Sequence, residues 1–345
     1  MKMPVRILLV LMCAALILAI PFAVSSPNML NDVKMELMNN GEDEIDFGRL
    51  LFSSACAEDE LEEEVFDEGE FASHPEWALP LDFTVPPAPN KDLYTENKYE
   101  DETIRVRVEE NQFDEGTKIY VAYIQISDPS QLRTAVINPE KFGSTRTKTV
   151  SYLARENNAV IAINGDNFID DPVKTSFEYR MTQKIRSKAN RLKDILIIDS
   201  KGDFHLFVKS EGIKEFPAEL KKDGLTLVNA FTFGPALVKD GQLLELDDNY
   251  GYNPGGREPR AAIGQLGPLS YVLVIVQGKG RNDGTGLSQG KLAEYMYNLG
   301  CVQAFNLDGG NSAEMVFGDQ IIKGMPNGDE RTLSDIIYFA TAQPE

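Results

Sequence analysis

Short strand-like segments joined by tight turns fill the chain from about Thr103 to its end. Ile104–Val108 alternates apolar and charged residues with a period of two, as a half-buried strand does. Lys201-Gly202 and Gly267-Pro268 each separate two apolar runs, and this spacing is typical of β-hairpins. Because strands joined by such turns run antiparallel, the chain is expected to build a largely antiparallel sheet.

Two segments, Thr145–Asn157 and Ser288–Leu299, place their apolar residues on one helical face, and Gly300 stops the second. Many hairpins with two or three helices predict an α+β fold, in which a mixed, largely antiparallel sheet packs against those helices. We expect one globular domain over residues 100–345. Further strands are predicted at Ile119–Ile126, Thr134–Ile137, Ala159–Ile163, Ile195–Ile198, Phe204–Val208, Ala236–Val238, Arg260–Gln265, Tyr271–Gln277, Val302–Leu307, Met315–Phe317 and Ile336–Phe339.

The N-terminus has the pattern of an export signal. Lys2 and Arg6 precede an apolar run, Ile7–Val24, and small residues permit cleavage after Ser25. The run is near the lower length limit for a membrane span, so an uncleaved signal anchor is the alternative. In both cases the positive end stays inside, which predicts a protein that is secreted or anchored on the outer face of the membrane. Residues 1–25 are the only expected membrane contact.

Acidity is concentrated near the N-terminus. Residues 1–100 hold 20 acidic and 6 basic side chains, and the whole chain has a net charge of −20. Nine of the thirteen residues in Glu58–Glu70 are acidic, and Leu79–Asn90 contains four prolines. Like charges and prolines favour an extended chain, so residues 26–95 are predicted to be a disordered tether. The remaining chain lacks a basic footprint for nucleic acid, and no nucleic-acid partner is expected.

Cysteine and histidine offer little chemistry here. Cys13 lies in the signal segment, and a Cys56–Cys301 disulfide is conceivable outside the cell, although Cys301 fits a buried core position better. The two histidines are His74, in the tether, and His205, on a predicted hairpin. Neither a metal site nor a histidine-dependent triad is therefore indicated. No cofactor is expected; calcium remains an alternative because Asp and Asn are frequent, but no ordered ligand loop is visible.

Two predicted strands end in similar polar residues. One ends at Asn164-Gly165-Asp166, and the other ends at Asn306-Leu307-Asp308-Gly309-Gly310. If these strands are neighbours, two carboxylates and two carboxamides meet at one sheet edge. The glycine amides after Asp308 can also turn toward a bound anion. The alternative is that both stretches are ordinary turns.

Arg260 lies at the start of a predicted strand, between Pro259 and the small residues Ala261 and Ala262. Its guanidinium offers a fixed fork of donors that suits a phosphate or a carboxylate. The alternative is a solvated surface cation.

Together these segments resemble the phosphodiester glycosidase family, which includes bacterial proteins linked to exopolysaccharide. The resemblance covers about Arg133–Phe339. There are departures: Gly165-Asp166 stands where the family often has two glycines, and Gln277-Gly278-Lys279 lacks the family's Asp. After Gly310, Asn311-Ser312-Ala313 stands where the family usually has a third glycine and paired serines. The matching segments are Ala162–Phe168, Phe233–Val238, Pro259–Gly264, Gly286-Leu287 before the helix, and Asn306–Ser312.

The resemblance implies hydrolysis of the bond between a sugar's anomeric carbon and a phosphodiester in a cell-surface or extracellular glycan. Most glycosidases need a carboxylic acid of raised pKa to protonate the leaving group. A departing phosphate monoester has a second pKa of about 6 and can leave with electrostatic help alone. The expected partner is therefore a phosphate-containing glycan or another sugar-1-phosphodiester.

The residues present suggest a division of roles. Asp308 is expected to act as nucleophile or base, with Asp166 as the second catalytic carboxylate; the opposite assignment fits equally well. The candidate substrate-binding residues are Arg260, Gly309 and Gly310 for the phosphate, Asn164 and Asn306 for sugar hydroxyls, and Asn311 and Ser312 beside them.

Two other functions are alternatives, and the first would use the same arginine and glycine amides. One is a non-catalytic module that binds an anionic cell-wall glycan, and the other is a structural envelope or sporulation protein. A binder shows a thermal shift with glycan phosphodiesters but releases no reducing sugar. A structural protein shows neither a thermal shift nor sugar release.

Overall fold

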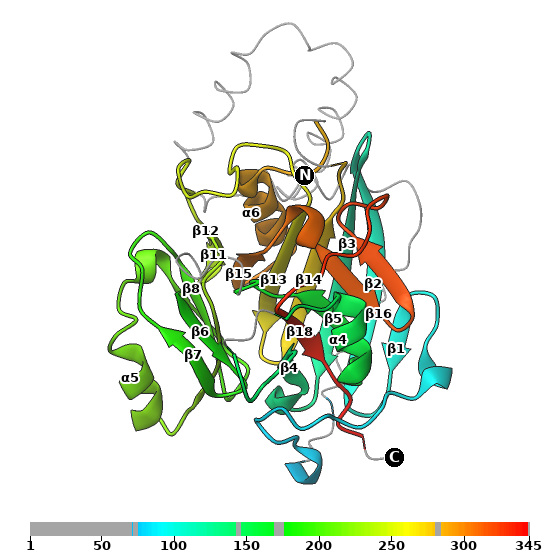
Figure 1. Cartoon of the computed structure of the whole chain (residues 1–345), viewed down its shortest axis with the longest axis vertical. Helices are drawn as coiled ribbons and strands as arrows, with labels where there is room; N and C mark the ends of the chain where they lie inside the picture. The colour runs from blue at the N-terminus through cyan, green and yellow to red at the C-terminus, as the bar shows by residue number, and fades with distance from the viewer. Residues whose placement is uncertain (1–70, 72–74, 143–145, 169–175, 280–283, 344–345) are drawn as a thin grey trace, which may run out of the picture. The chain divides into compact units, whose positions relative to one another are not determined.

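The computed structural model describes residues 71, 75–142, 146–168, 176–279 and 284–343. The predicted signal segment, Cys56 and residues 26–70 of the predicted tether lie outside these ranges. The described chain forms three sheets in which the paired strands run antiparallel, together with three α-helices (Figure 1).

The largest sheet has eight strands in the order β1-β2-β3-β14-β13-β15-β11-β12. Its central hairpin pairs Arg260 with Val276, and its β13–β15 pairing sets Ala261 opposite Leu307. This register brings the start of β13 to the end of β15, where the Asp308 segment begins. The strands are β1 (Lys98–Glu100), β2 (Ile104–Asp114), β3 (Thr117–Ile126), β11 (Ala236–Lys239), β12 (Gln242–Leu243), β13 (Arg260–Gly267), β14 (Ser270–Val276) and β15 (Gln303–Leu307).

The second sheet has five strands in the order β17-β16-β5-β18-β4. Its middle strand pairs Ile163 with Met315 on one side and with Ile337 on the other. The end of β5, with Asn164, is thereby held between two strands. The strands are β4 (Leu132–Val136), β5 (Ile161–Asn164), β16 (Glu314–Phe317), β17 (Gln320–Lys323) and β18 (Asp335–Phe339).

The third sheet also has five strands, in the order β7-β6-β10-β8-β9. Glu178 and Arg180 alternate along β6, so they face the same side of this sheet. The strands are β6 (Phe177–Arg180), β7 (Gln183–Ser187), β8 (Ile195–Asp199), β9 (Phe204–Phe207) and β10 (Leu227–Phe231).

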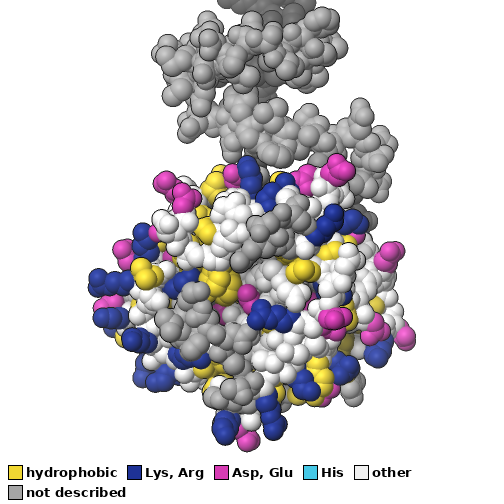
Figure 2. Space-filling model, turned by 45° about the horizontal axis from the view of Figure 1, so that its top comes forward, with side chains coloured by type: hydrophobic (Ala, Val, Ile, Leu, Met, Phe, Trp, Pro, Cys, Tyr) yellow, Lys and Arg dark blue, Asp and Glu magenta, His cyan; other side chains and the backbone are white. Residues whose placement is uncertain are grey.

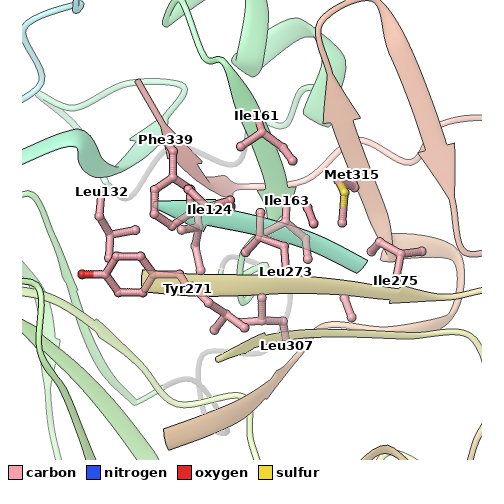
Figure 3. Close-up of a cluster of buried hydrophobic side chains, with 14 of the residues drawn as sticks. Ile124, Leu132, Ile161, Ile163, Tyr271, Leu273, Ile275, Leu307, Met315 and Phe339 are labelled. Carbon is pink, nitrogen blue, oxygen red and sulfur yellow. The ribbon is translucent and has the colours of Figure 1, made fainter. Parts of the chain in front are cut away.

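The main core lies between the eight-stranded sheet and the β5 sheet, where apolar side chains of both meet (Figure 3). Helix α6 (Gln289–Asn298) packs on the outer face of the larger sheet through Leu292 and Met296. Helix α4 (Val150–Glu156) covers the outer face of the β5 sheet, and α5 (Phe216–Lys222) packs against the third sheet. The first two sheets and their helices thus form four layers, α/β/β/α.

The α+β class, the largely antiparallel pairing and the number of helices agree with the prediction. The two predicted hairpins also form, as β8–β9 and β13–β14. One expectation was wrong: the strands make three separate sheets rather than one. In addition, α4 begins at Val150, later than predicted, and α5, β6, β7 and β10 had no sequence prediction.

Part of the predicted tether is packed against the fold. The guanidinium of Arg133, which is fully buried, donates hydrogen bonds to the backbone carbonyls of Pro80, Asp82 and Thr84 at 2.7–3.0 Å. Leu79 N–H also donates to Ser130 Oγ at 2.8 Å. Residues 79–84 of the predicted tether are therefore packed against the domain and are not a free spacer.

Cys301 is a free thiol, 2% exposed, in the apolar layer under α6, as expected of a small core residue. None of the helices in the described part of the chain is long and apolar enough to cross a membrane.

Candidate active site

The two predicted strand ends meet, although their strands belong to different sheets. Asn164, at the end of β5, donates from Nδ2 to the backbone carbonyl of Asp308 at 2.7 Å. Its Oδ1 accepts a hydrogen bond from the Glu314 N–H at 3.1 Å. Asn164 is fully buried, and these bonds join the end of β5 to the segment after β15. The predicted convergence therefore occurs at a junction between sheets, not at one sheet edge.

Asp308 is the carboxylate that reaches the surface at this junction, where 14% of its side chain is exposed. Burial raises its pKa from 3.8 to about 7, and the charge of Asp166 adds to the rise. Hydrogen bonds from the Ser312 side chain and the Gly309 backbone, and the charge of Arg331, act in the opposite direction. A carboxyl with such a pKa changes protonation state near neutral pH, as a catalytic acid or base must.

Arg331 is a site residue that sequence reasoning missed. Its Nη1 donates to Ser312 Oγ at 2.7 Å and lies 3.9 Å from Asp308 Oδ2. The side chain is 41% exposed, so the guanidinium borders both the carboxylate and solvent. Arg331 lies in the loop before β18, which carries no recognisable motif, and only the fold brings it to Asp308.

Asp166 lies deeper than Asp308, with an exposure of 1%. Its Oδ2 accepts hydrogen bonds from the backbone N–H groups of Thr232 and Phe233 at 2.6 and 3.2 Å. Burial raises its pKa from 3.8 to about 6, against the opposing charge of Arg180. Asp166 therefore influences Asp308 by its charge from inside the protein.

Next to Asp166 is a buried ion pair. Arg180 donates from Nε and Nη2 to Asp335 Oδ2 at 2.9 and 2.7 Å, and its guanidinium lies over the Phe231 ring at 4.0 Å. Gly165 is required beside it, because a Cβ at this position would lie 2.2 Å from Asp335 Oδ2. The glycine between Asn164 and Asp166 thus lets the strand end approach the ion pair.

Arg260 is engaged differently from the prediction. Its guanidinium donates to four backbone carbonyls, at 2.8–3.0 Å, and the side chain is 3% exposed. These bonds hold the loop after β12 in place and leave one N–H of the guanidinium for any other partner. The geometry therefore favours a structural role for Arg260. The arginine that lies next to the Asp308 carboxylate is Arg331. The carbonyls belong to Tyr252, Asn253, Gly256 and Leu287.

The glycine amides after Asp308 are also used within the protein. Gly310 N–H donates to the Pro259 carbonyl at 2.8 Å, with a φ of 60° that favours glycine. Gly309 hydrogen-bonds to Asp308 itself, and a Cβ on it would lie 2.9 Å from the Pro259 oxygen. Both amides thus shape the segment around Asp308, which differs from the predicted anion cradle.

The remaining predicted residues lie around the same segment. Asn306, 1% exposed, donates from Nδ2 to the Gly234 carbonyl at 2.8 Å, and its Oδ1 has no hydrogen-bond partner among the described residues. Ser312 is buried between Asp308 and Arg331, in the single helical turn η6 (Gly310–Ser312), whereas Asn311 is exposed. Within the described ranges, no group of three or more His, Cys, Asp or Glu side chains could hold a metal ion.

Comparison with known proteins gives a consistent family. Residues 157–340, more than half of the chain, match the model of the phosphodiester glycosidase family. A prophage-derived uncharacterized protein, YomE, of Bacillus subtilis (strain 168) is 24% identical over 203 residues, which cover 58% of this chain and 30% of that protein. The match thus spans less than a third of the length of that relative.

Among solved structures, the catalytic domain of zebrafish N-acetylglucosamine-1-phosphodiester alpha-N-acetylglucosaminidase has a similar fold. The TM-score is 0.54 at 14% identity, and the match covers 74% of this chain and 87% of that one. A hypothetical protein from Synechocystis matches with a TM-score of 0.46 at 17% identity, covering 70% of this chain and 63% of the other. By the extent of the family match, the chain belongs to the phosphodiester glycosidase family.

Proposed function

We propose that this protein is an extracytoplasmic hydrolase that cleaves the bond between a sugar's anomeric carbon and a phosphodiester in a surface or extracellular glycan. The observation that carries the proposal is the position of Asp308. Its partly exposed carboxylate lies at the junction of two strand ends, with a pKa near 7, and an arginine nitrogen lies 3.9 Å away. A carboxylate beside a cation suits a substrate that combines an anomeric carbon with a phosphate.

The leaving group can depart without a proton from an acid of the protein. As the bond from the anomeric carbon to the phosphate oxygen breaks, the electron pair departs with a phosphate monoester whose second pKa is about 6. A cation beside the phosphate stabilises the negative charge that develops there. Arg331 is suitably placed for this task, because its guanidinium is at the surface and already next to Asp308.

Asp308 acts at the anomeric carbon, either as the nucleophile or as the base that takes a proton from water. Both roles require the ionised carboxylate. Asp166 is too deeply buried to touch a substrate in this arrangement, so its role is to set the electrostatic environment of Asp308. Asn306 is as deeply buried as Asp166, so its part is to hold the segment before Asp308 through its hydrogen bond to the Gly234 carbonyl.

The protein is expected to recognise a single phosphodiester at the site. In Figure 2, basic and acidic side chains are interspersed over the described part of the visible face, with no continuous basic surface. Such a surface favours contact with one phosphodiester at the site over binding along the length of a polyanion.

The test uses the full chain and its Asp308→Asn variant with a panel of synthetic sugar-1-phosphodiesters, and release of reducing sugar is measured. The expected loss of rate is about 1,000-fold or more, typical when a group required in the transition state is removed. Asp319→Asn, an exposed carboxylate in the β16–β17 turn, is the matched control and should retain activity. Wild-type rates in Asp308→Asn would show the assignment to be wrong. A thermal shift without sugar release would support the binding module instead.

The extracytoplasmic location rests on residues 1–25 alone. Fractionation of cells that express the full chain, compared with a chain whose Lys2 and Arg6 are replaced, tests it. Recovery of the unaltered chain from the cytoplasm would contradict the location without affecting the site assignment.

A further inference from the structure

A fully buried cluster beside the candidate site contains more carboxyl groups than cations. Asp166, Glu178 and Asp335 share the space around a single guanidinium, that of Arg180, and all four side chains are at most 1% exposed. Arg180 is matched by Asp335, whose Oδ2 accepts two of its N–H donors. Asp166 and Glu178 would then both be anions without a second cation in the described cluster. An unpaired buried charge is among the least favourable features of a fold.

Arg180 cannot satisfy Glu178 by hydrogen bonding. Its Nη1 lies 2.9 Å from Glu178 Oε2, but both Nη1 hydrogens are donated to the backbone carbonyls of Tyr179 and Ala230. Consequently neither carboxyl oxygen of Glu178 has a hydrogen-bond donor among the described residues. Asp166 has the same deficiency at Oδ1, although its Oδ2 accepts two backbone N–H groups.

Two ionised carboxylates can only accept hydrogen bonds, so two facing ones leave each other unsatisfied. A proton on one of them converts the pair into a donor and an acceptor and reduces their total charge to −1. The two backbone N–H donors favour Asp166 as the anionic member. We propose that Glu178 is a positioning residue whose carboxyl carries a proton at neutral pH and donates it in a hydrogen bond to Asp166.

The direction of the Glu178 pKa shift agrees with this arrangement. Burial and the charge of Asp166 hold the pKa of Glu178 well above its ordinary value, and the proposed hydrogen bond to Asp166 would act in the same direction. Arg180 opposes this shift, and Asp335 reinforces it. On the neighbouring strand, Arg186 lies opposite Glu178 and donates to the Phe168 carbonyl at 2.6 Å.

The protonation of Glu178 does not depend on the proposed function, but its effect on catalysis by Asp308 rests on that function. With Glu178 protonated, the pair presents one negative charge behind Asp308, and that charge helps to raise the Asp308 pKa toward neutral pH. Two negative charges on the pair would raise the Asp308 pKa further, and an uncharged pair would leave this pKa lower. Glu178 thus acts through Asp166 and does not need to touch a substrate.

Infrared difference spectroscopy of the full chain tests the proton directly. The wild-type spectrum minus that of Glu178→Gln at neutral pH should contain the carbonyl stretch of a protonated carboxylic acid. Subtraction is needed because Glu314, whose pKa is raised to about 8, contributes a similar band to both proteins. Glu110→Gln, an exposed carboxylate on β2, is the matched control and should show only the loss of an ionised carboxylate.

Two further variants separate positioning from packing. Asp166→Asn removes the charge that keeps Glu178 protonated, so the carboxylic-acid band should weaken. Glu178→Leu removes the donor and should lower kcat/KM about ten-fold, consistent with losing one hydrogen bond to a buried charge. Glu178→Gln keeps a donor and should recover most of that loss, with a melting temperature within about 4 °C of wild type.

Absence of the band from the wild-type minus Glu178→Gln spectrum overturns the proposal, since Glu178 is then ionised. A large fall in melting temperature for Glu178→Gln also overturns it, because it shows that Arg180 needs the negative charge. The infrared result does not depend on turnover. If the band is present in a protein that hydrolyses no sugar phosphodiester, the proposed function fails and the shared proton stands.

Discussion

The Asn164 side chain donates a hydrogen bond to the backbone carbonyl of Asp308 at 2.7 Å, across 144 positions of sequence. This bond fixes the carboxylate-bearing segment after β15 to the end of β5, in a different sheet. Because the same side chain accepts from Glu314 N–H, one buried amide determines how the two sheets meet at the site.

Asn164→Asp should disrupt this junction. A carboxylate can still accept from Glu314 N–H but cannot donate to the Asp308 carbonyl, and it adds a buried charge near Asp166. We expect a loss of about 2–4 kcal/mol in the free energy of unfolding at neutral pH, measured by urea denaturation. Asn97→Asp, at an exposed position just before β1, is the control. Equal stability of Asn164→Asp and wild type would show that the bond is not needed.

Gly165→Ala tests the close approach of the strand end to the buried ion pair. The added methyl would lie 2.2 Å from Asp335 Oδ2, so the Arg180–Asp335 contact must shift. Thermal denaturation should show a loss of about 1–3 kcal/mol. Gly290→Ala in α6 meets no atom within 4 Å and should be neutral or stabilising. The two variants should therefore differ in sign, and a neutral Gly165→Ala would contradict the packing at this position.

Stability should depend on pH through Asp308. Its pKa is raised from 3.8 to about 7 in the folded protein, so the stabilising protonated form is lost as the pH rises through 7. Asp308→Asn cannot titrate at this position and so does not lose this stability. The unfolding free energy of the variant minus that of wild type should therefore increase by about 2–3 kcal/mol from pH 5 to pH 8. Asp319→Asn should show no such gain. A constant difference between Asp308→Asn and wild type across this range would exclude the raised pKa.

Arg331→Gln should affect both substrate binding and titration. The cation lowers the Asp308 pKa, so its removal should move the acid limb of the kcat/KM profile to higher pH. Loss of a charged donor to the phosphate should also raise KM about ten-fold or more. Arg331→Lys keeps the charge without the fork and should shift the acid limb less. Unchanged KM and an unchanged profile in Arg331→Gln would remove this residue from the site.

Much of the fold was predictable because local signals and tertiary packing agree. The β13–β14 hairpin and helix α6 follow from apolar periodicity, turn residues and the Ser288 cap. Strand β6 escaped prediction for a physical reason. Glu178 and Arg180 occupy fully buried positions that normally hold apolar residues, and their partners come from distant segments.

The candidate site was predictable in part. Repeated Asn, Gly and Asp at two strand ends pointed to Asn164 and Asp308, which the structure joins. The role of Arg260 could not be read from its neighbours, because the carbonyls that surround it converge only in the folded loop. Arg331 has no local signal at all, since its relation to Asp308 depends on the return of β18 to the β5 sheet.

The central claim is that water attacks at the sugar and not at the phosphorus. Hydrolysis of a sugar-1-phosphodiester by the full chain in water labelled with heavy oxygen, followed by mass spectrometry of both products, tests this most directly. The account predicts that the label enters the released sugar and that the phosphate monoester carries none. Label in the phosphate product would contradict it, because the bond broken would then be the one to phosphorus.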